Sequence, residues 1–252
     1  MTYVVTGGAQ GIGRAIAERL AADGHVIVLD VADRLDWNHD RVTLVSGDAA
    51  DPAVARRAAD TAERAGPLTG WVNNAAIFRD AGLAGSTAPQ VLELITANLA
   101  LAVTGCHTAI NHFLSYGRGG AIVNVSSHQA QRPVRGALPY ATAKAAVEGL
   151  TRAVAVDHGP AGIRANAVAL GSIVTGRYEE FRAANPGVDA DMAALHPLGR
   201  PGTAEEVAAA VAFLLAPGFV NGAVLPVDGG RAVNGPDPEA RPVTVTPPVR
   251  GA

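Results

Sequence analysis

Short, almost continuously apolar runs alternate with longer alanine-rich stretches from residue 2 to about residue 230. The apolar runs show no polar alternation, which is typical of strands buried on both faces. In the longer stretches, apolar residues recur at spacings of three and four, as along one face of a helix. The pattern predicts a doubly wound α/β fold with a mostly parallel, seven-stranded sheet and helices on both faces. Strands are expected at residues 2–6, 25–30, 42–45, 70–73, 121–126, 164–169 and 223–227, and helices near 12–23, 52–65, 88–115, 139–158 and 203–216.

The length of the chain fits one large domain or two small ones. It has 252 residues, and α/β folds of this size often form one unit. No repeat or low-complexity block interrupts the pattern, so residues 1–234 are expected to form a single domain. Residues 235–252 contain five prolines and almost no large apolar side chains, so they cannot continue the sheet. We expect this tail to run over the surface or to lie across a neighbouring subunit and cover a site there.

Charge and cysteine content narrow the class of protein further. The net charge is −3 and the pI is about 6.1, which gives no indication of binding to nucleic acid or to anionic membranes. Cys106 is the only cysteine, so an intramolecular disulfide is excluded and no metal site is expected. The first residues lack a basic region and a long apolar run, so neither a signal peptide nor a membrane anchor is expected. A cytoplasmic location is therefore predicted.

A glycine-rich turn follows the first predicted strand and precedes a helical stretch, with the sequence Thr6-Gly7-Gly8-Ala9-Gln10-Gly11-Ile12-Gly13. Glycines let a backbone turn tightly against a pyrophosphate, and the N-terminus of a helix presents free N–H groups. The spacing fits neither the G-x-G-x-x-G pattern of dinucleotide folds nor the phosphate loop of nucleoside triphosphatases. The turn is thus predicted to be a phosphate site, with a plain tight turn as the alternative. Its predicted contacts are Gly7, Gln10, Gly11, Ile12 and Gly13.

Two acidic residues follow the second and third predicted strands. Asp30 ends the second strand, where a carboxylate can accept hydrogen bonds from both hydroxyls of an adenosine ribose in a Rossmann-type sheet. It would repel a 2′-phosphate, and residues 8–10 offer no cation to offset this, so NAD rather than NADP is the predicted cofactor. Asp48 is placed to accept from the adenine amino group. The alternatives are a strand-end role for Asp30 and an ordinary turn role for Asp48.

Tyr140 and Lys144 lie four residues apart at the start of a predicted helix, so their side chains share one face. Lys144 is the only lysine in a chain that otherwise uses arginine. An ammonium at about 5 Å from a phenol, with an effective dielectric near 20, favours the phenolate by about 3 kcal/mol, which would lower the pKa of Tyr140 from about 10 towards 8. Such a tyrosine can act as a general base near neutral pH.

Together these segments resemble the short-chain dehydrogenase/reductase family over residues 2 to about 230. The glycine turn is similar to the family's TGxxxGxG turn, residues 73–76 to its NNAG segment, and Tyr140 with Lys144 to its YxxxK motif. Ser127 stands at the position of the family's catalytic serine, and Asn98 at that of its helix asparagine. Residues 166–175 resemble the segment that lines the nicotinamide.

This resemblance implies an enzyme that transfers a hydride between a nicotinamide cofactor and a secondary alcohol or ketone. Tyr140 would be the general acid/base, and Ser127 would hydrogen-bond the reacting oxygen. Lys144 would lower the pKa of the tyrosine and hold the nicotinamide ribose, while Asn98 would support a chain of waters from Lys144 to solvent. The other cofactor contacts that it implies are Asn74, Ala75, Gly171, Ile173 and Thr175, the last at the carboxamide.

The same resemblance implies a mobile lid at about residues 172–196 and a homotetramer or homodimer that packs through the two long helices and the last strand. Polar groups near the lid, namely Arg79, His128, Gln129 and Arg135, favour a small polar substrate such as a sugar, polyol or hydroxy acid. His128 is interpreted as lining the pocket or the surface rather than as a base. The charges of Arg177, Glu179, Glu180 and Arg182 are alternatively a solvated helix face.

The chain departs from the family pattern at a few positions, none of which is one of the reacting groups. Leu170 stands where the family usually has proline, and Ala76 replaces the last glycine of NNAG. These departures bear on cofactor fit and substrate shape. Two other functions stay open: an NADPH-dependent reductase of 3-oxoacyl thioesters, against which Asp30 argues, and a non-catalytic dinucleotide sensor, against which the intact Ser127, Tyr140 and Lys144 argue.

Overall fold

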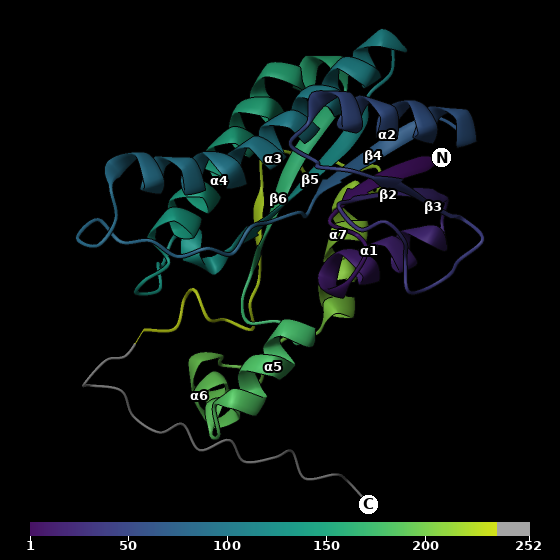
Figure 1. Cartoon of the computed structure of the whole chain (residues 1–252). Helices are drawn as coiled ribbons and strands as arrows, with labels where there is room; N and C mark the ends of the chain where they lie inside the picture. Colours follow the sequence, from purple (N-terminus) through teal and green to yellow (C-terminus); the bar gives the residue numbers. More distant parts are fainter. Residues whose placement is uncertain (236–252) are drawn as a thin grey trace, which may run out of the picture.

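The computed structural model describes residues 1–235, and its framework is one seven-stranded sheet (Figure 1). The strand order is β3-β2-β1-β4-β5-β6-β7, and every neighbouring pair is parallel. The order reverses between β1 and β4, and in sheets of this kind ligands bind at the carboxyl ends of the strands beside such a reversal. The predicted doubly wound fold is confirmed. The strands are β1 (Thr2–Thr6), β2 (His25–Asp30), β3 (Val42–Ser46), β4 (Leu68–Asn73), β5 (Gly120–Ser127), β6 (Ile163–Leu170) and β7 (Val224–Val227).

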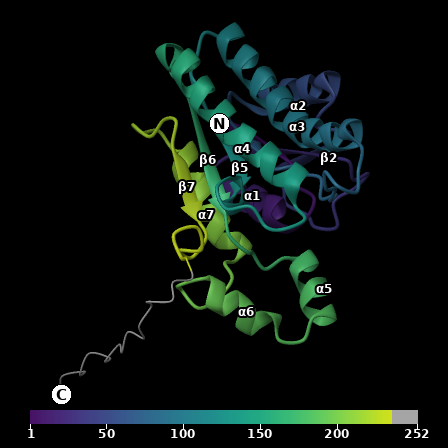
Figure 2. The ribbon, with the colours of Figure 1, turned by 90° about the vertical axis from the view of Figure 1, so that its left-hand side faces the viewer.

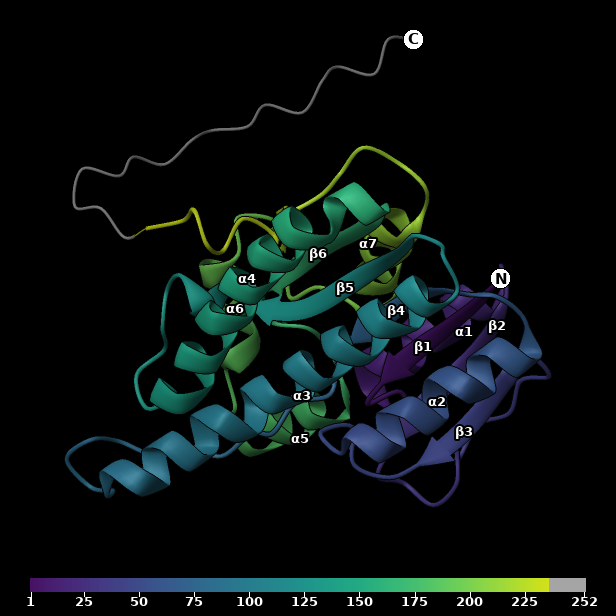
Figure 3. The same ribbon diagram turned by 90° about the horizontal axis from the view of Figure 1, so that it is seen from above.

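Helices cover both faces of the sheet. The helices α2 (Pro52–Ala65), α3 (Ala88–Ser115) and α4 (Leu138–His158) lie across one face, as Figure 3 shows from above. The helices α1 (Gly11–Ala21) and α7 (Ala204–Leu215) pack together on the other face (Figure 2). By length and composition alone α3 could also cross a membrane, but it packs between α2 and α4 against the sheet, and core helices of soluble proteins meet the same criterion.

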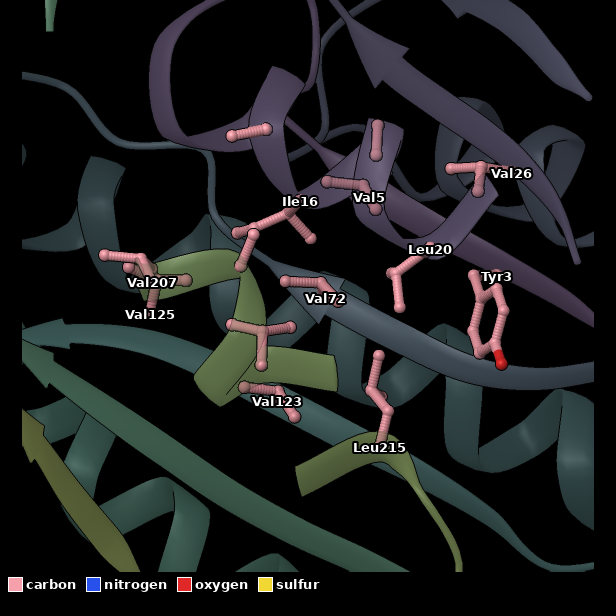
Figure 4. Close-up of a cluster of buried hydrophobic side chains, with 14 of the residues drawn as sticks. Tyr3, Val5, Ile16, Leu20, Val26, Val72, Val123, Val125, Val207 and Leu215 are labelled. Carbon is pink, nitrogen blue, oxygen red and sulfur yellow. The ribbon is translucent and has the colours of Figure 1, made fainter. Parts of the chain in front are cut away.

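The sheet separates two apolar cores, which explains why the strands are apolar without alternation. Along β1, Tyr3 and Val5 face α1 and α7, where they join Ile16 and Leu215 (Figure 4). Val4, between them, faces the opposite side and packs in the core under α2, α3 and α4. Both faces of β1 are therefore buried, which explains why its middle residues, Tyr3 to Val5, are apolar without alternation.

The structure corrects some predicted boundaries and adds two helices. The fourth strand begins at Leu68 rather than residue 70, because Leu68 pairs with Thr2 at an irregular step in the β1–β4 ladder. The predicted lid region contains α5 (Gly176–Ala184) and α6 (Val188–Leu195), which stand apart from the helical layers in Figures 1 and 2. Residues 236–252, nearly all of the predicted tail, lie outside the described residues.

Candidate active site

The predicted site residues gather at the carboxyl edge of the sheet. Asp30 and Ser127 are the last residues of β2 and β5, and the glycine turn follows β1 directly. Asn74 comes immediately after β4, and Gly171 immediately after β6. The parallel topology thus brings together loops that are far apart in the sequence.

Glycine is required in the turn between β1 and α1. Gly7 and Gly11 have φ angles of +65° and +55°, in the left-handed region that side chains disfavour. A Cβ on Gly13 would lie 1.9 Å from the carbonyl oxygen of Gly7, so α1 approaches the turn too closely for any side chain. The turn is compact because these three positions carry no side chain.

The segment after β4 braces this turn. The side-chain amide of Asn74 donates to the carbonyls of Thr6 (3.0 Å) and Gly7 (2.9 Å). In return, the hydroxyl oxygen of Thr6 accepts from the backbone N–H groups of Asn74 (3.0 Å) and Ala75 (3.1 Å). Asn74 and Ala75, predicted to contact the cofactor, therefore also fix the shape of the glycine turn.

The start of α1 has the features of a phosphate site. Gln10 is the N-cap residue, but its side chain makes no capping hydrogen bond. The first N–H groups of a helix carry a partial positive charge and lack partners inside the helix. Gln10 and Gly11 are exposed and Ile12 is half-buried, so the end of the helix is open to solvent. The close glycine cradle and this uncapped end fit the pyrophosphate of a dinucleotide.

Asp30 lies against the glycine turn. One of its oxygens accepts from the N–H of Ala9 at 2.9 Å, and the other accepts from the N–H of Ala32 at 3.1 Å. Trp37, which the sequence did not single out, covers the same turn by donating its indole N–H to the carbonyl of Ala9 at 2.9 Å. Arg14 lies over the Trp37 ring, with its guanidinium carbon 5.4 Å from the ring centre, and pairs with Glu18.

Asp48 lies in the exposed turn between β3 and α2. Its carboxylate accepts from the N–H of Ala50 at 2.8 Å, which is the geometry of an ordinary aspartate turn. The turn is at the same edge of the sheet as Asp30, since β3 pairs with β2. Its predicted contact with adenine stays a prediction.

Ser127, Tyr140 and Lys144 are brought together by β5 and the first turns of α4. The Ser127 hydroxyl lies close enough to the Tyr140 phenol to lower the pKa of that phenol. The Nζ atom of Lys144 lies 5.4 Å from the centre of the Tyr140 ring and donates to the carbonyl of Val125 at 2.7 Å. Ser127 and Lys144 are buried. A phenol, a hydroxyl and an ammonium thus converge at one point, as the sequence pattern predicts.

The predicted fall in the pKa of Tyr140 is wrong for this structure. Burial raises the pKa of Tyr140 to about 12, although the nearby Ser127 hydroxyl and the charge of Arg177 lower it. Burial also lowers the pKa of Lys144 to about 8. The prediction assumed a solvated pair, whereas burial disfavours the charged form of both groups.

The side chain of Asn98 holds the backbone at Ile77, three residues after Asn74. Its side-chain oxygen accepts from the N–H of Ile77, and its side-chain amide donates to the carbonyl of Ile77, both at 2.9 Å. It is buried in the middle of α3. Its expected support of a chain of waters stays a prediction, and its observed contacts fix the position of Ile77.

The segment after β6 runs beside the glycine turn. Thr175 lies beside Gly11, since a Cβ added there would meet the Thr175 methyl at 3.7 Å. The Thr175 hydroxyl accepts from the N–H of Tyr178 and so caps α5. Ile173 is buried and pairs with Gly202, and Gly171 packs closely on Asp228. The predicted lid region therefore begins beside the predicted phosphate site.

His128 and Leu170 join the ends of β5 and β6. The Nδ1 atom of His128 lies 3.1 Å from the carbonyl oxygen of Leu170, and both residues are buried. Burial lowers the pKa of His128, so its ring is neutral at neutral pH. Leu170, which stands where the family usually has proline, thus holds His128 in place through its backbone carbonyl.

Sequence reasoning missed an aromatic contact on Tyr140. The ring of Phe78 stacks on the Tyr140 ring with centroids 5.2 Å apart, and the guanidinium carbon of Arg177 lies 3.9 Å from the centre of the Phe78 ring. The other lid charges behave as a solvated face, because Arg182 pairs with Glu179 and Asp189. No local pattern marks Phe78, since its partners lie far away in the sequence.

Comparisons with known proteins agree with this geometry. A family model described as "Enoyl-(Acyl carrier protein) reductase" matches residues 7–232. The 3-oxoacyl-[acyl-carrier-protein] reductase MabA of Mycobacterium avium is 37% identical over 235 residues, which cover 92% of this chain and 90% of that protein. The family match thus spans the glycine turn, the Tyr140 segment and the lid.

Solved structures share the same architecture over nearly their whole lengths. The aldohexose dehydrogenase AldT of Thermoplasma acidophilum, in ligand-free form, superposes with a TM-score of 0.84 at 30% identity and covers 96% of this chain and 97% of its own. ElxO with NADP bound also has a TM-score of 0.84, at 26% identity, with 92% and 99% covered. The family binds a nicotinamide dinucleotide. The chain therefore belongs to the short-chain dehydrogenase/reductase family and is an oxidoreductase that acts on alcohol or ketone groups.

Proposed function

We propose that the protein is an NAD-dependent dehydrogenase that interconverts a secondary alcohol and a ketone, with Tyr140 as general acid/base. The observation that carries the choice of NAD is the carboxylate of Asp30, held beside the glycine turn by the N–H of Ala9. An adenosine ribose bound at this turn would meet a negative charge, which accepts hydrogen bonds from hydroxyls and repels a phosphate. Arg14, which lies over the Trp37 ring beside this turn, pairs with Glu18.

The residues of the site divide the chemistry among them. A bound nicotinamide supplies or accepts the hydride. In oxidation, Tyr140 takes the proton of the alcohol, and in reduction it gives that proton back to the carbonyl oxygen. Ser127 hydrogen-bonds the reacting oxygen as its charge changes. Lys144 contributes a positive charge next to the phenol and holds the ribose, and Asn98 supports the waters that carry protons from Lys144 to solvent.

The cofactor preference is the direct test of this assignment. We expect kcat/KM to be about 100-fold higher with NAD+ than with NADP+, because like charges at contact distance repel by a few kcal/mol. Asp30→Asn removes the charge but keeps an oxygen for the N–H of Ala9, so it should cut the preference to about tenfold or less. The measurement is reduction of each cofactor, followed by near-ultraviolet absorbance, across secondary alcohols, polyols, sugars and hydroxy acids.

Asp48→Asn is the matched control, since Asp48 lies in an exposed turn at the same edge and makes only a local hydrogen bond. It should leave the ratio of the two cofactors unchanged. A wild-type preference for NADP+ would overturn the assignment. It would support the second candidate, an NADPH-dependent reductase of 3-oxoacyl thioesters, which is favoured by the likeness to MabA and to ElxO with NADP bound.

We also propose a cytoplasmic homotetramer or homodimer. Apolar side chains remain exposed along the outer faces of α3 and α4, including Leu92, Val103 and Val156. Exposed apolar faces of this kind are typical of surfaces between subunits. Light scattering coupled to size exclusion at micromolar concentration should give two or four times the chain mass of 25.5 kDa. A monomer at that concentration would rule out this assembly.

A further inference from the structure

The aromatic ring of Phe78 links the catalytic tyrosine to the lid. On one side it stacks on Tyr140, with centroids 5.2 Å apart and the rings inclined by 30°. The guanidinium of Arg177, from the first turn of α5, lies over the same ring at 3.9 Å. One aromatic ring is therefore shared by the reacting phenol and a lid cation, which is a favourable cation–π geometry.

The backbone next to Phe78 and Arg177 is held in place, whereas both side chains are exposed to solvent. Asn98 holds the backbone of Ile77 through two hydrogen bonds, and Phe78 is the next residue. Thr175 caps α5 and lies beside Gly11, and Arg177 follows two residues later. Yet Phe78 is 55% exposed and Arg177 is also exposed, so solvent reaches the face that they form beside Tyr140.

In the part of the chain that the structure describes, the guanidinium of Arg177 has no polar partner. Within residues 1–235 it makes no ion pair and donates no hydrogen bond, whereas Arg182, one helical turn further along α5, pairs with two carboxylates. Lys144, the other cation near Tyr140, is buried and donates to Val125. The charge of Arg177 lowers the pKa of Tyr140, so its field reaches the reacting oxygen.

We propose that Arg177 binds a carboxylate of the substrate while Phe78 packs against the carbon chain that joins this carboxylate to the reacting carbon. This inference rests on the dehydrogenase function proposed above and narrows its substrates to hydroxy acids and the corresponding oxo acids. The planar guanidinium presents paired N–H donors that match the two oxygens of a carboxylate. A neutral polyol or sugar would offer hydroxyl oxygens but no negative charge, and hydrogen bonds to such neutral acceptors are weaker.

A dinucleotide pyrophosphate would be a second anion near Arg177, because Thr175, two residues before Arg177, lies beside Gly11. Both ligands would use the same charge-assisted hydrogen bonds, so the experiment must separate them. We assign Arg177 to the substrate because its guanidinium lies on the ring that stacks against Tyr140, the group that meets the substrate. Affinity for NADH distinguishes the two assignments directly.

The test compares three alcohols of similar size that differ in charge: 3-hydroxybutyrate, its methyl ester and 4-aminobutan-2-ol. Wild-type kcat/KM should favour the acid over the ester by about 100-fold, as expected for loss of a charge-assisted bidentate contact. Arg177→Gln should bring the ratio close to one by lowering only the value for the acid. Arg177→Glu should shift the preference to the amine. Arg182→Gln, a lid arginine of the same helix, should keep the wild-type ratio.

Binding measurements keep this inference separate from the proposed function. Calorimetric titration of 3-hydroxybutyrate into the enzyme–NADH complex should show binding that Arg177→Gln weakens by about tenfold or more, with NADH affinity unchanged. Absence of turnover with every alcohol would count against the dehydrogenase function, while the titration would still report on Arg177. Equal acid-to-ester ratios in wild type and Arg177→Gln, or no binding of the acid, would overturn the substrate assignment. Weaker NADH binding alone would reassign Arg177 to the pyrophosphate.

Discussion

Tyr140→Phe is expected to lower kcat by about 1,000-fold in both directions, while NADH binds within about twofold of the wild-type affinity. The substitution removes only the hydroxyl that takes and returns the proton. The ring that stacks on Phe78 stays, so the packing around α4 is kept. Turnover is measured by near-ultraviolet absorbance and NADH affinity by fluorescence titration.

Ser127, which lies beside the hydroxyl that Tyr140→Phe removes, keeps another hydrogen bond. Ser127 also accepts from the N–H of Gln129 at 3.2 Å, so the variant should fold and keep its melting temperature within a few degrees. Tyr116→Phe removes the same atom from an exposed ring at the end of α3 and serves as the control, with unchanged turnover expected. Retained activity in Tyr140→Phe would exclude this tyrosine as the acid/base.

The fold could be predicted, and so could the meeting of the site residues at one edge of the sheet. Both follow from patterns within short segments of the sequence. Continuous apolar runs identify strands buried on both faces, and parallel strands must bring their carboxyl ends to one edge. That rule already places Asp30, Asn74 and Ser127 together. The spacing of Tyr140 and Lys144 fixes them on one helical face, because a helix repeats in 3.6 residues. These statements need no knowledge of what packs against the site.

The features that sequence reasoning missed depend on partners distant in the chain. The pKa of Tyr140 is raised rather than lowered because burial outweighs the local charges, and burial is a property of the assembled fold. Trp37 reaches Ala9, and Arg177 reaches Phe78, through contacts that no spacing rule encodes. A tryptophan in the loop after β2 and an arginine in the lid are ordinary surface residues until the loops are placed.

Gly13→Ala is expected to weaken NADH binding by about 100-fold and to lower the melting temperature, because the added methyl has no room. Its Cβ would lie 1.9 Å from the carbonyl oxygen of Gly7 and 2.6 Å from the side-chain nitrogen of Asn74. Those two atoms form a 2.9 Å hydrogen bond that braces the glycine turn. The methyl group therefore displaces α1 from the turn whose N–H groups are proposed to face the pyrophosphate. Fluorescence titration and thermal unfolding measure the two effects.

Alanine substitutions at Gly218 and Gly11 distinguish the steric clash at Gly13 from the general effect of replacing a glycine. Gly218→Ala places a methyl in open space, where the nearest atom is the carbonyl oxygen of Ala216 at 4.0 Å, so binding and stability should stay at wild-type levels. Gly11→Ala has room, because its Cβ would meet Thr175 at 3.7 Å, but its φ of +55° costs about 1–2 kcal/mol with a side chain. The predicted order of NADH affinity is thus Gly218→Ala, then Gly11→Ala, then Gly13→Ala. Wild-type affinity in a folded Gly13→Ala variant would show that the cofactor does not rest on this turn. If that variant fails to fold, unchanged affinity in Gly11→Ala carries the same conclusion, because backbone strain at Gly11 also alters the N-terminus of α1.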